Sequence, residues 1–232
     1  MISITKENLD KKEAAVLIDK QENSNILLVS FGGVAMGLPV PVFEFMRTLD
    51  KYNINKVFIR DFQQAWYTKG IKDYSSNIDE TVEYLRELIQ LYGREKTIFL
   101  GNSAGGFAAV LFGALLNVKE VHAFAPQIFI NWPKRLRYLD FRWTSKMIFN
   151  LNHKEYYSFD LSKRLANLSF DTEMNIYWDK SHKLDNIHVE ELFYLKDKIQ
   201  FLPRLGGGHN VIKELKKDGS LEQILKRASE NV

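Results

Sequence analysis

One stretch constrains the fold more than any other, residues 96–116, KTIFLGNSAGGFAAVLFGALL. It begins as a short apolar run of β type, passes through a serine flanked by glycines, and continues as an apolar run of helical length. Residues 101–105, GNSAG, fit the pattern G-x-S-x-G. Only small residues fit around such a turn, because larger side chains would collide with the adjoining strand and helix. The segment predicts a strand, a tight turn with Ser103 at its tip, and a helix.

Segments typical of strands alternate with segments typical of helices along the chain. Strands are expected at residues 14–19, 25–31, 56–61, 96–101, 121–126, 174–178 and 198–203. Further helices are expected at residues 40–52, 78–93, 185–196 and 209–232. Nearly continuous apolar strands are typical of a sheet buried on both faces. We therefore expect an α/β fold with a doubly wound, mostly parallel sheet, formed by a single domain over residues 1–232.

The segment 128–170 interrupts this alternation. It is rich in aromatic and basic residues, and it is longer than the single helix needed between the strands expected on either side. Two interpretations stay open. The segment is either a long helical connection that packs on the sheet or a small helical cap over a pocket, since long insertions in compact domains often act as lids.

Composition excludes several classes of function. The 32 basic and 29 acidic residues give a net charge of +3 without a basic block, which argues against nucleic acid as a partner. Cysteine is absent and the histidines lack metal-ligand spacing, so we expect neither a metal nor another cofactor. The N-terminus lacks a secretory signal pattern, and no apolar run reaches the roughly 18–20 residues that span a bilayer. We expect a cytoplasmic protein without a membrane span.

A serine nucleophile needs a base, which is usually a histidine oriented by a carboxylate. His209 is the best placed histidine, because it follows the last expected strand on a glycine-rich loop that opens the last helix. The other histidines lie in an expected strand, in the insertion or near the expected acid; they are His122, His153, His182 and His188. We predict Ser103 as the nucleophile and His209 as its base.

The acid is expected between the serine and the histidine, after the strand at residues 174–178. Asp179 follows this strand directly and would share the rigidity of its end. Asp185 lies six residues later at the start of the next helix, where an aspartate also serves as a plain N-cap. The residue pattern alone leaves both aspartates open.

The order Ser103, Asp185, His209 on an alternating chain resembles the α/β-hydrolase superfamily, over nearly the whole sequence. The resemblance implies an α/β-hydrolase fold, and it favours Asp185 as the acid, because an aspartate followed by a short apolar step into a helix is frequent there. It also implies an oxyanion hole formed by the backbone N–H groups of Gly33 and Ala104. Phe31 replaces the histidine that often precedes the first of these donors.

Shorter patterns, SFGG, GNSAGGFAA, FAPQ and GGGHNV, resemble a group of bacterial hydrolase-like proteins linked to surface polysaccharide biosynthesis. This resemblance implies an esterase that acts on carbohydrate esters such as O-acetyl groups. The alternative is a non-catalytic protein of the same fold, serving as a partner in a glycan-assembly or secretion complex. The segment with Arg60, Asp61, Trp66 and Tyr67 follows a strand where ligands bind in open α/β sheets, so these residues are candidates for substrate contact or for structural roles.

Overall fold

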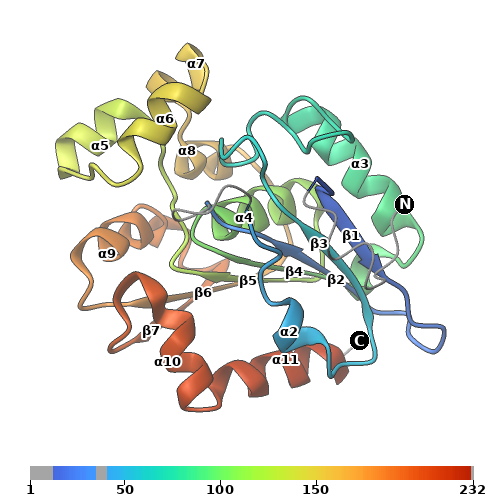
Figure 1. Ribbon diagram of the computed structural model, residues 1–232. Coiled ribbons are helices and arrows are strands. Elements are labelled where there is room, and N and C mark those ends of the chain that lie inside the picture. The colour runs from blue at the N-terminus through green and yellow to red at the C-terminus, as the bar shows by residue number, and fades with distance from the viewer. Residues whose placement is uncertain (1–12, 35–40, 231–232) are drawn as a thin grey trace.

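The computed structural model describes residues 13–34 and 41–230, and within them the chain forms a sheet of seven strands (Figure 1). The strands are β1 (Val16–Asp19), β2 (Leu27–Phe31), β3 (Asn55–Ile59), β4 (Thr97–Asn102), β5 (Glu120–Phe124), β6 (Glu173–Asp179) and β7 (Ile199–Arg204). Their order in the sheet is β1-β3-β2-β4-β5-β6-β7. Only β1, at one edge, runs antiparallel to its neighbour; the other strands are parallel.

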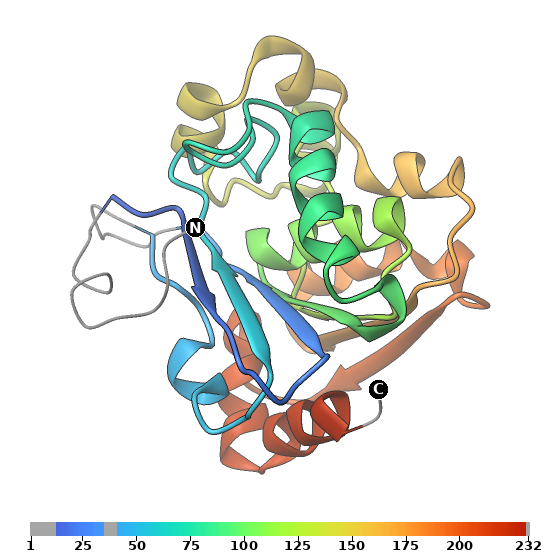
Figure 2. The same ribbon diagram turned by 90° about the vertical axis from the view of Figure 1, so that its right-hand side faces the viewer.

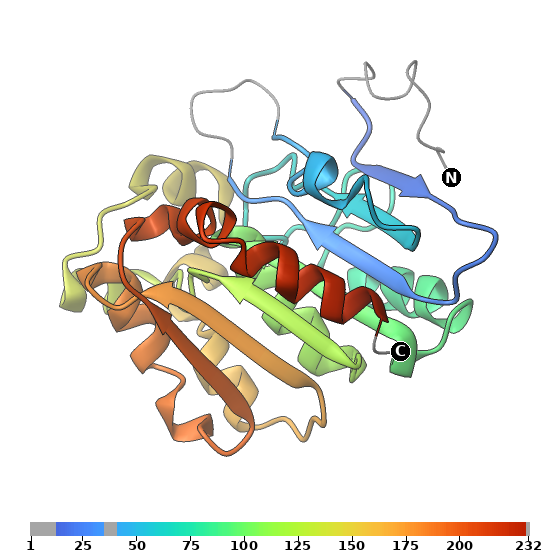
Figure 3. The same ribbon diagram turned by 90° about the horizontal axis from the view of Figure 1, so that it is seen from below.

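Helices cover both faces of the sheet. One face carries α3 (Ile78–Gln90), α4 (Ala104–Leu116), α8 (Leu161–Ala166) and α9 (Lys183–Glu190). The opposite face carries α2 (Met46–Leu49), α10 (Val211–Lys217) and α11 (Ser220–Glu230), which lie in front of the strands in Figure 3. Successive residues of a strand point to opposite faces, so Val29 packs in the first core and Leu28 in the second. The predicted α/β fold with a doubly wound, mostly parallel sheet is confirmed.

Helix α4 lies at the centre of the molecule, beside α3 on the same face of the sheet (Figures 1 and 2). Its residues from Ala104 to Ala114 are all buried, and it contacts β2, β4 and β5. A helix that is apolar all round is stable only inside the protein, between the sheet and other helices. The composition of this segment therefore places α4 in the core. The helix begins two residues after β4 ends, so its N-terminus lies next to the carboxyl end of that strand.

Strands lie at all seven expected segments, and the differences concern helices. The helix expected at residues 40–52 is only α2, four residues long, preceded by Phe45 with φ 63°; Val40 lies outside the described residues. A residue with left-handed backbone angles cannot be part of a right-handed helix, so the helix begins only after Phe45. The helix expected at the C-terminal end is divided at Gly219, which has φ +78° and separates α10 from α11.

The insertion forms four short helices. They are α5 (Trp132–Tyr138), α6 (Thr144–Asn150), α7 (His153–Ser158) and α8. Figure 1 shows α5, α6 and α7 together at one corner of the molecule, whereas α8 packs against α4. Lys134 of α5 forms an ion pair with Glu191, which directly follows α9, at 2.5 Å. This pair connects the insertion to the segment between β6 and β7. Within the described residues, no helix has both the length and the apolar character to cross a membrane.

Replacement of Gly105 by alanine should destabilise the protein strongly. A Cβ at this position would lie 2.1 Å from the carbonyl oxygen of Phe31, so strand β2 or helix α4 has to shift. We expect a loss of about 3 kcal/mol or more in the free energy of unfolding, measured by urea denaturation. Gly93→Ala is the control: it meets no atom within 4 Å but has φ +91°, so it should cost only about 1 kcal/mol. Equal losses in both variants would contradict the close approach at Gly105.

Candidate active site

Ser103 lies in the turn that joins β4 to α4. Its backbone has φ 56° and ψ −116°, a conformation that a residue with a side chain adopts at an energetic cost. The residues before and after the serine approach each other closely: a Cβ on Gly101 would lie 2.1 Å from the carbonyl oxygen of Gly105. Ser103 is 7% exposed, and its N–H donates to the carbonyl of Phe124 on the neighbouring strand. The sharp turn predicted from the sequence is therefore present.

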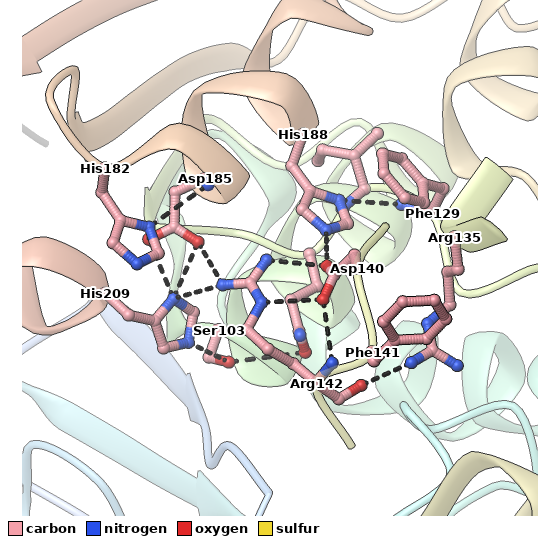
Figure 4. Close-up of polar contacts among 12 residues, drawn as sticks. Ser103, Phe129, Arg135, Asp140, Phe141, Arg142, His182, Asp185, His188 and His209 are labelled. Carbon is pink, nitrogen blue, oxygen red and sulfur yellow. Dashed lines mark hydrogen bonds and ion pairs between the residues drawn. The ribbon is translucent and has the colours of Figure 1, made fainter. Parts of the chain in front are cut away.

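His209 approaches Ser103 from the loop after β7. Gly206, Gly207 and Gly208 all have positive φ angles, which lets the chain turn sharply into the short helical turn that carries the histidine. The His209 Nε2 atom lies 2.8 Å from the Ser103 Oγ atom, although the two residues are 106 positions apart in the chain. Figure 4 shows the imidazole between the serine and a carboxylate. A neutral ring with its proton on Nδ1 can accept the hydroxyl proton at Nε2.

That carboxylate belongs to Asp185, in the first turn of α9. Both of its oxygens lie 2.9 Å from the His209 Nδ1 atom, and the residue is 1% exposed. Burial by itself would raise the pKa of Asp185, but the hydrogen bond from His209 and the nearby charge of Arg142 lower it below its usual value. Asp185 is therefore ionised at neutral pH and oriented toward the ring.

Asp179, the other candidate acid, has different partners. Its side chain accepts hydrogen bonds from the Ser181 hydroxyl at 2.6 Å and from the Gly208 N–H at 2.9 Å. Burial would raise its pKa, but these bonds lower it. The structure thus brings Asp185 to the imidazole, whereas Asp179 supports the backbone of the loop that carries His209.

Two residues near the serine were not identified from the sequence as site residues. The Gln127 Oε1 atom accepts a hydrogen bond from the indole N–H of Trp66 at 2.8 Å and lies 3.5 Å from the Ser103 Oγ atom. Arg142, from the loop between α5 and α6, donates from Nη1 to the Asp185 Oδ1 atom at 2.6 Å (Figure 4). Gln127 stands in the FAPQ pattern, but no feature of the insertion sequence distinguishes Arg142 from its other basic residues.

The two expected oxyanion donors have different environments. Ala104 is the first residue of α4, so its N–H has no acceptor within the helix. Gly33 lies beside the nucleophile, since a Cβ on it would be 3.8 Å from the Ser103 Cβ atom. Its N–H, however, donates to the Glu44 Oε1 atom at 3.2 Å. Gly33 can donate to a reacting oxygen only when this bond opens.

Glu44 is partly buried, and burial raises its pKa to about 7, although the bonds from Gly33 and Asn102 and the charge of Lys216 lower it. It lines a cavity of about 220 Å³, together with Phe45, Asn102, Asn210, Ile212, Lys213 and Lys216; Asn102 and Asn210 are the chain neighbours of Ser103 and His209. A second cavity of about 500 Å³ lies between α3 and α7, and it is not lined by Ser103, Asp185 or His209. Among residues 13–34 and 41–230 no cluster of three or more side chains could hold a metal ion.

The residues expected either to contact substrate or to support the fold take structural positions. Trp66 and Tyr67 are fully buried, and the Tyr67 hydroxyl donates to backbone carbonyls of Gly32 and Ile59. Asp61, also buried, accepts hydrogen bonds from the N–H groups of Ala65 and Tyr67. This segment therefore forms a buried support beneath Gln127 and the loop that carries Gly33.

Solved structures with similar architecture support the assignment of the fold. A capsule O-acetyltransferase of Neisseria meningitidis serogroup A matches with a TM-score of 0.67 and 18% identity over 91% of this chain and 90% of that one. The fluorophosphonate-binding serine hydrolase F of Staphylococcus aureus, with substrate bound, matches with a TM-score of 0.57 and 12% identity over 99% and 90%. This chain has the α/β-hydrolase fold.

A third similar structure is a glycosylation associate protein (Gap123) complex from Streptococcus agalactiae. It matches with a TM-score of 0.68 and 19% identity, over 93% of this chain but only 44% of the other. No protein-family model matches the chain, and no curated protein sequence is similar to it. At these identities the similarity demonstrates the fold, and the activity has to be argued from the site itself.

Replacement of the two aspartates should have separable effects. Asp185→Asn should lower kcat by about 10⁴, because the amide has no negative charge to stabilise the imidazolium and its NH2 group can face Nδ1, which favours the wrong tautomer of His209. Asp179→Asn should mainly lower stability, by about 1–3 kcal/mol, since it weakens the bonds to Ser181 and Gly208. Steady-state kinetics and urea denaturation of both variants test this. A larger loss of kcat in Asp179→Asn would show that Asp179 is the acid.

Glu44→Gln should change how stability depends on pH. The pKa of Glu44 rises from 4.5 in the unfolded chain to about 7 in the folded protein, so ionisation of Glu44 costs stability as the pH rises through this window. The amide does not ionise, so the variant should gain about 2 kcal/mol relative to wild type between pH 5 and pH 8. Urea denaturation at both values measures the gain. Glu87→Gln, at an exposed position, is the control, and a gain of equal size there would contradict the prediction.

Proposed function

We propose that this protein is a serine hydrolase that cleaves carboxylic esters through an acyl-enzyme, with Ser103, His209 and Asp185 as its catalytic triad. The observation that carries the proposal is the continuous chain of contacts, 2.8 Å from Oγ to Nε2 and 2.9 Å from Nδ1 to the carboxylate. These distances are within the range in which a histidine can take a proton from a hydroxyl. The strained backbone of Ser103 supports the same role, because it turns the hydroxyl toward the imidazole.

In this mechanism Ser103 Oγ attacks the carbonyl carbon, and its proton passes to the His209 Nε2 atom. The negative charge on the substrate oxygen is stabilised by the N–H of Ala104, and by that of Gly33 once the Glu44 carboxylate has left it. When the C–O bond breaks, the alcohol takes the proton from Nε2 and leaves an acyl-serine. Water then attacks this ester with His209 as base, which releases the acid and restores Ser103.

The proposed substrate is a carbohydrate ester such as an O-acetylated sugar. The similar architecture of the capsule O-acetyltransferase supports this class, although at 18% identity it is support by analogy. The insertion supplies aromatic faces of the kind that pack against sugar rings. Trp132 stacks on Tyr156 with ring centroids 5.9 Å apart, and beside them Phe141 is 51% exposed.

A second candidate is transfer of an acetyl group to a sugar hydroxyl, which shares the acyl-enzyme and differs only in the acceptor. A variant of the capsule O-acetyltransferase is bound to CoA, which makes acetyl-CoA the donor to test. A third candidate is a non-catalytic partner in a glycan-assembly complex, which the similarity to the Gap123 complex favours. The proposed triad distinguishes these candidates by its reactivity, since only the first two need an activated serine.

The decisive experiment is labelling with a fluorophosphonate probe, combined with turnover of p-nitrophenyl acetate and of acetylated sugars. Wild type should be labelled at Ser103, and Ser103→Ala should lose both labelling and turnover, down to about the 10³–10⁴-fold acceleration that binding and the oxyanion donors retain. Ser181→Ala is the control, because Ser181 lies near the site but bonds to Asp179. A folded wild-type protein whose Ser103 stays unlabelled would favour the non-catalytic partner.

The same assay separates hydrolysis from transfer. With acetyl-CoA present, a hydrolase releases acetate at a rate that does not depend on an added carbohydrate. A transferase forms an acetylated carbohydrate at the expense of acetate, in proportion to the acceptor concentration.

A further inference from the structure

We propose that Arg142 is a positioning residue: it fixes the carboxylate of Asp185 and, by repelling a proton on the imidazole, sets the pH range in which His209 acts as a base. The proposal deepens the proposed function and rests on the triad assigned there. Arg142 reaches the triad from the insertion, on the loop between α5 and α6, whereas the three triad residues follow β4, β6 and β7. Figure 4 shows its guanidinium between Asp185 and a second carboxylate, Asp140.

One oxygen of Asp185 has two donors. The Oδ1 atom lies 2.6 Å from the Arg142 Nη1 atom and 2.9 Å from the His209 Nδ1 atom. Asp185 is 1% exposed, so solvent does not compete for this oxygen. A carboxylate held on one side by a permanent cation keeps a fixed orientation for the imidazole, but it stabilises a proton on that ring less than a free carboxylate would.

Arg142 is itself held by Asp140. Its Nε atom lies 3.0 Å from Asp140 Oδ1 and its Nη2 atom 2.8 Å from Asp140 Oδ2, a two-point contact. The backbone N–H of Arg142 also donates to Asp140 Oδ1 at 3.0 Å. Two parallel hydrogen bonds define the plane of a guanidinium, so Arg142 cannot turn away from Asp185 without breaking them.

His188 in turn holds Asp140. Its Nδ1 atom accepts a hydrogen bond from the backbone N–H of Ile128 at 3.0 Å, so the ring proton is on Nε2 and is donated to Asp140 Oδ2, also at 3.0 Å. Burial lowers the pKa of His188, although the hydrogen bond to Asp140 raises it. The lowered pKa favours the neutral ring. Burial would raise the pKa of Asp140, but His188 and Arg142 hold it well below its usual range.

The charges around His209 follow from these contacts. Asp185 and His182 face its ring from the start of α9, Arg142 faces it from the insertion, and Asp179 accepts a hydrogen bond from the N–H of Gly208 in its loop. Arg135 of α5 adds a further positive charge near Arg142, whose carbonyl oxygen accepts from it at 2.6 Å. Arg142 Nη1 lies 3.4 Å from His209 Nδ1; both atoms carry protons when the ring donates to Asp185, so this contact is repulsive.

Without Arg142, two buried carboxylates would face the triad with no cation between them. A proton would then bind the imidazole more tightly, and a protonated His209 cannot accept the proton of Ser103. A merely structural arginine would differ in its effects: its loss would lower stability and activity at every pH without moving the titration of His209. This difference makes the proposal testable.

The experiment compares Arg142→Gln with wild type by two readouts. One is the pH dependence of kcat/KM for p-nitrophenyl acetate, and the other is the NMR titration of ¹⁵N-labelled His209, assigned with a His209→Gln variant. In Arg142→Gln both midpoints should move to higher pH by about one unit, and kcat should fall by about 10- to 100-fold through misorientation of the triad. Arg137→Gln, an exposed arginine of the same insertion, is the control and should move neither.

Asp140→Asn tests the charge with the opposite sign. It removes a negative charge and leaves one acceptor oxygen, which can still accept from Arg142, so the His209 midpoint should stay or fall, whereas Arg142→Gln should raise it. An unchanged or lower midpoint in folded Arg142→Gln, an equal rise in Arg137→Gln, or a rise in Asp140→Asn would overturn the proposal. If Arg142→Gln does not fold, the Asp140→Asn midpoint decides. If wild type has no turnover that depends on Ser103, the proposed function fails, and the NMR midpoints alone decide on Arg142.

Discussion

The close approach of strand and helix around Ser103 is the constraint on which the site depends. At Gly101 and Gly105 a single added carbon would lie 2.1 Å from a neighbouring carbonyl oxygen, so β4, α4 and β2 meet backbone to backbone. This contact forces the serine into its strained conformation and directs its hydroxyl toward His209. Because α4 is buried all round, the core supplies the stabilisation that offsets the strain.

The negative charge of Asp185 is stabilised by side chains from two different parts of the chain. Asp185 is buried and ionised, and it receives donors both from His209 after β7 and from Arg142 in the insertion. A buried carboxylate with fewer partners would take up a proton, because desolvation penalises the ionised form. The insertion between β5 and β6 is therefore, through Arg142, part of the electrostatic environment of Asp185 and His209.

The sequence predicted most of the fold but only part of the site. Seven strands and Ser103 in its turn were predictable because local patterns encode them: short apolar runs, and glycines where backbones approach closely. The choice between Asp179 and Asp185 was not predictable from residue pattern, since both follow β6 and only the path of the chain decides which meets His209. Arg142 and the Glu44–Gly33 contact were missed, because each depends on segments whose mutual placement no local pattern encodes.

Hydrolysis and acyl transfer share the first half of the proposed reaction, so the residues of the triad cannot distinguish them. The difference lies in what reaches the acyl-serine next, since a sugar hydroxyl competes with water only where the site excludes water and binds the sugar close to the ester. Ser103 is 7% exposed and the His209 side chain 20%, so access to both is already narrow. The insertion borders this access through Arg142, whose chain neighbour Phe141 is exposed. In the proposed reaction, access of the acceptor to the acyl-serine therefore depends on the insertion, whereas the placement of Ser103, Asp185 and His209 depends on the ends of β4, β6 and β7.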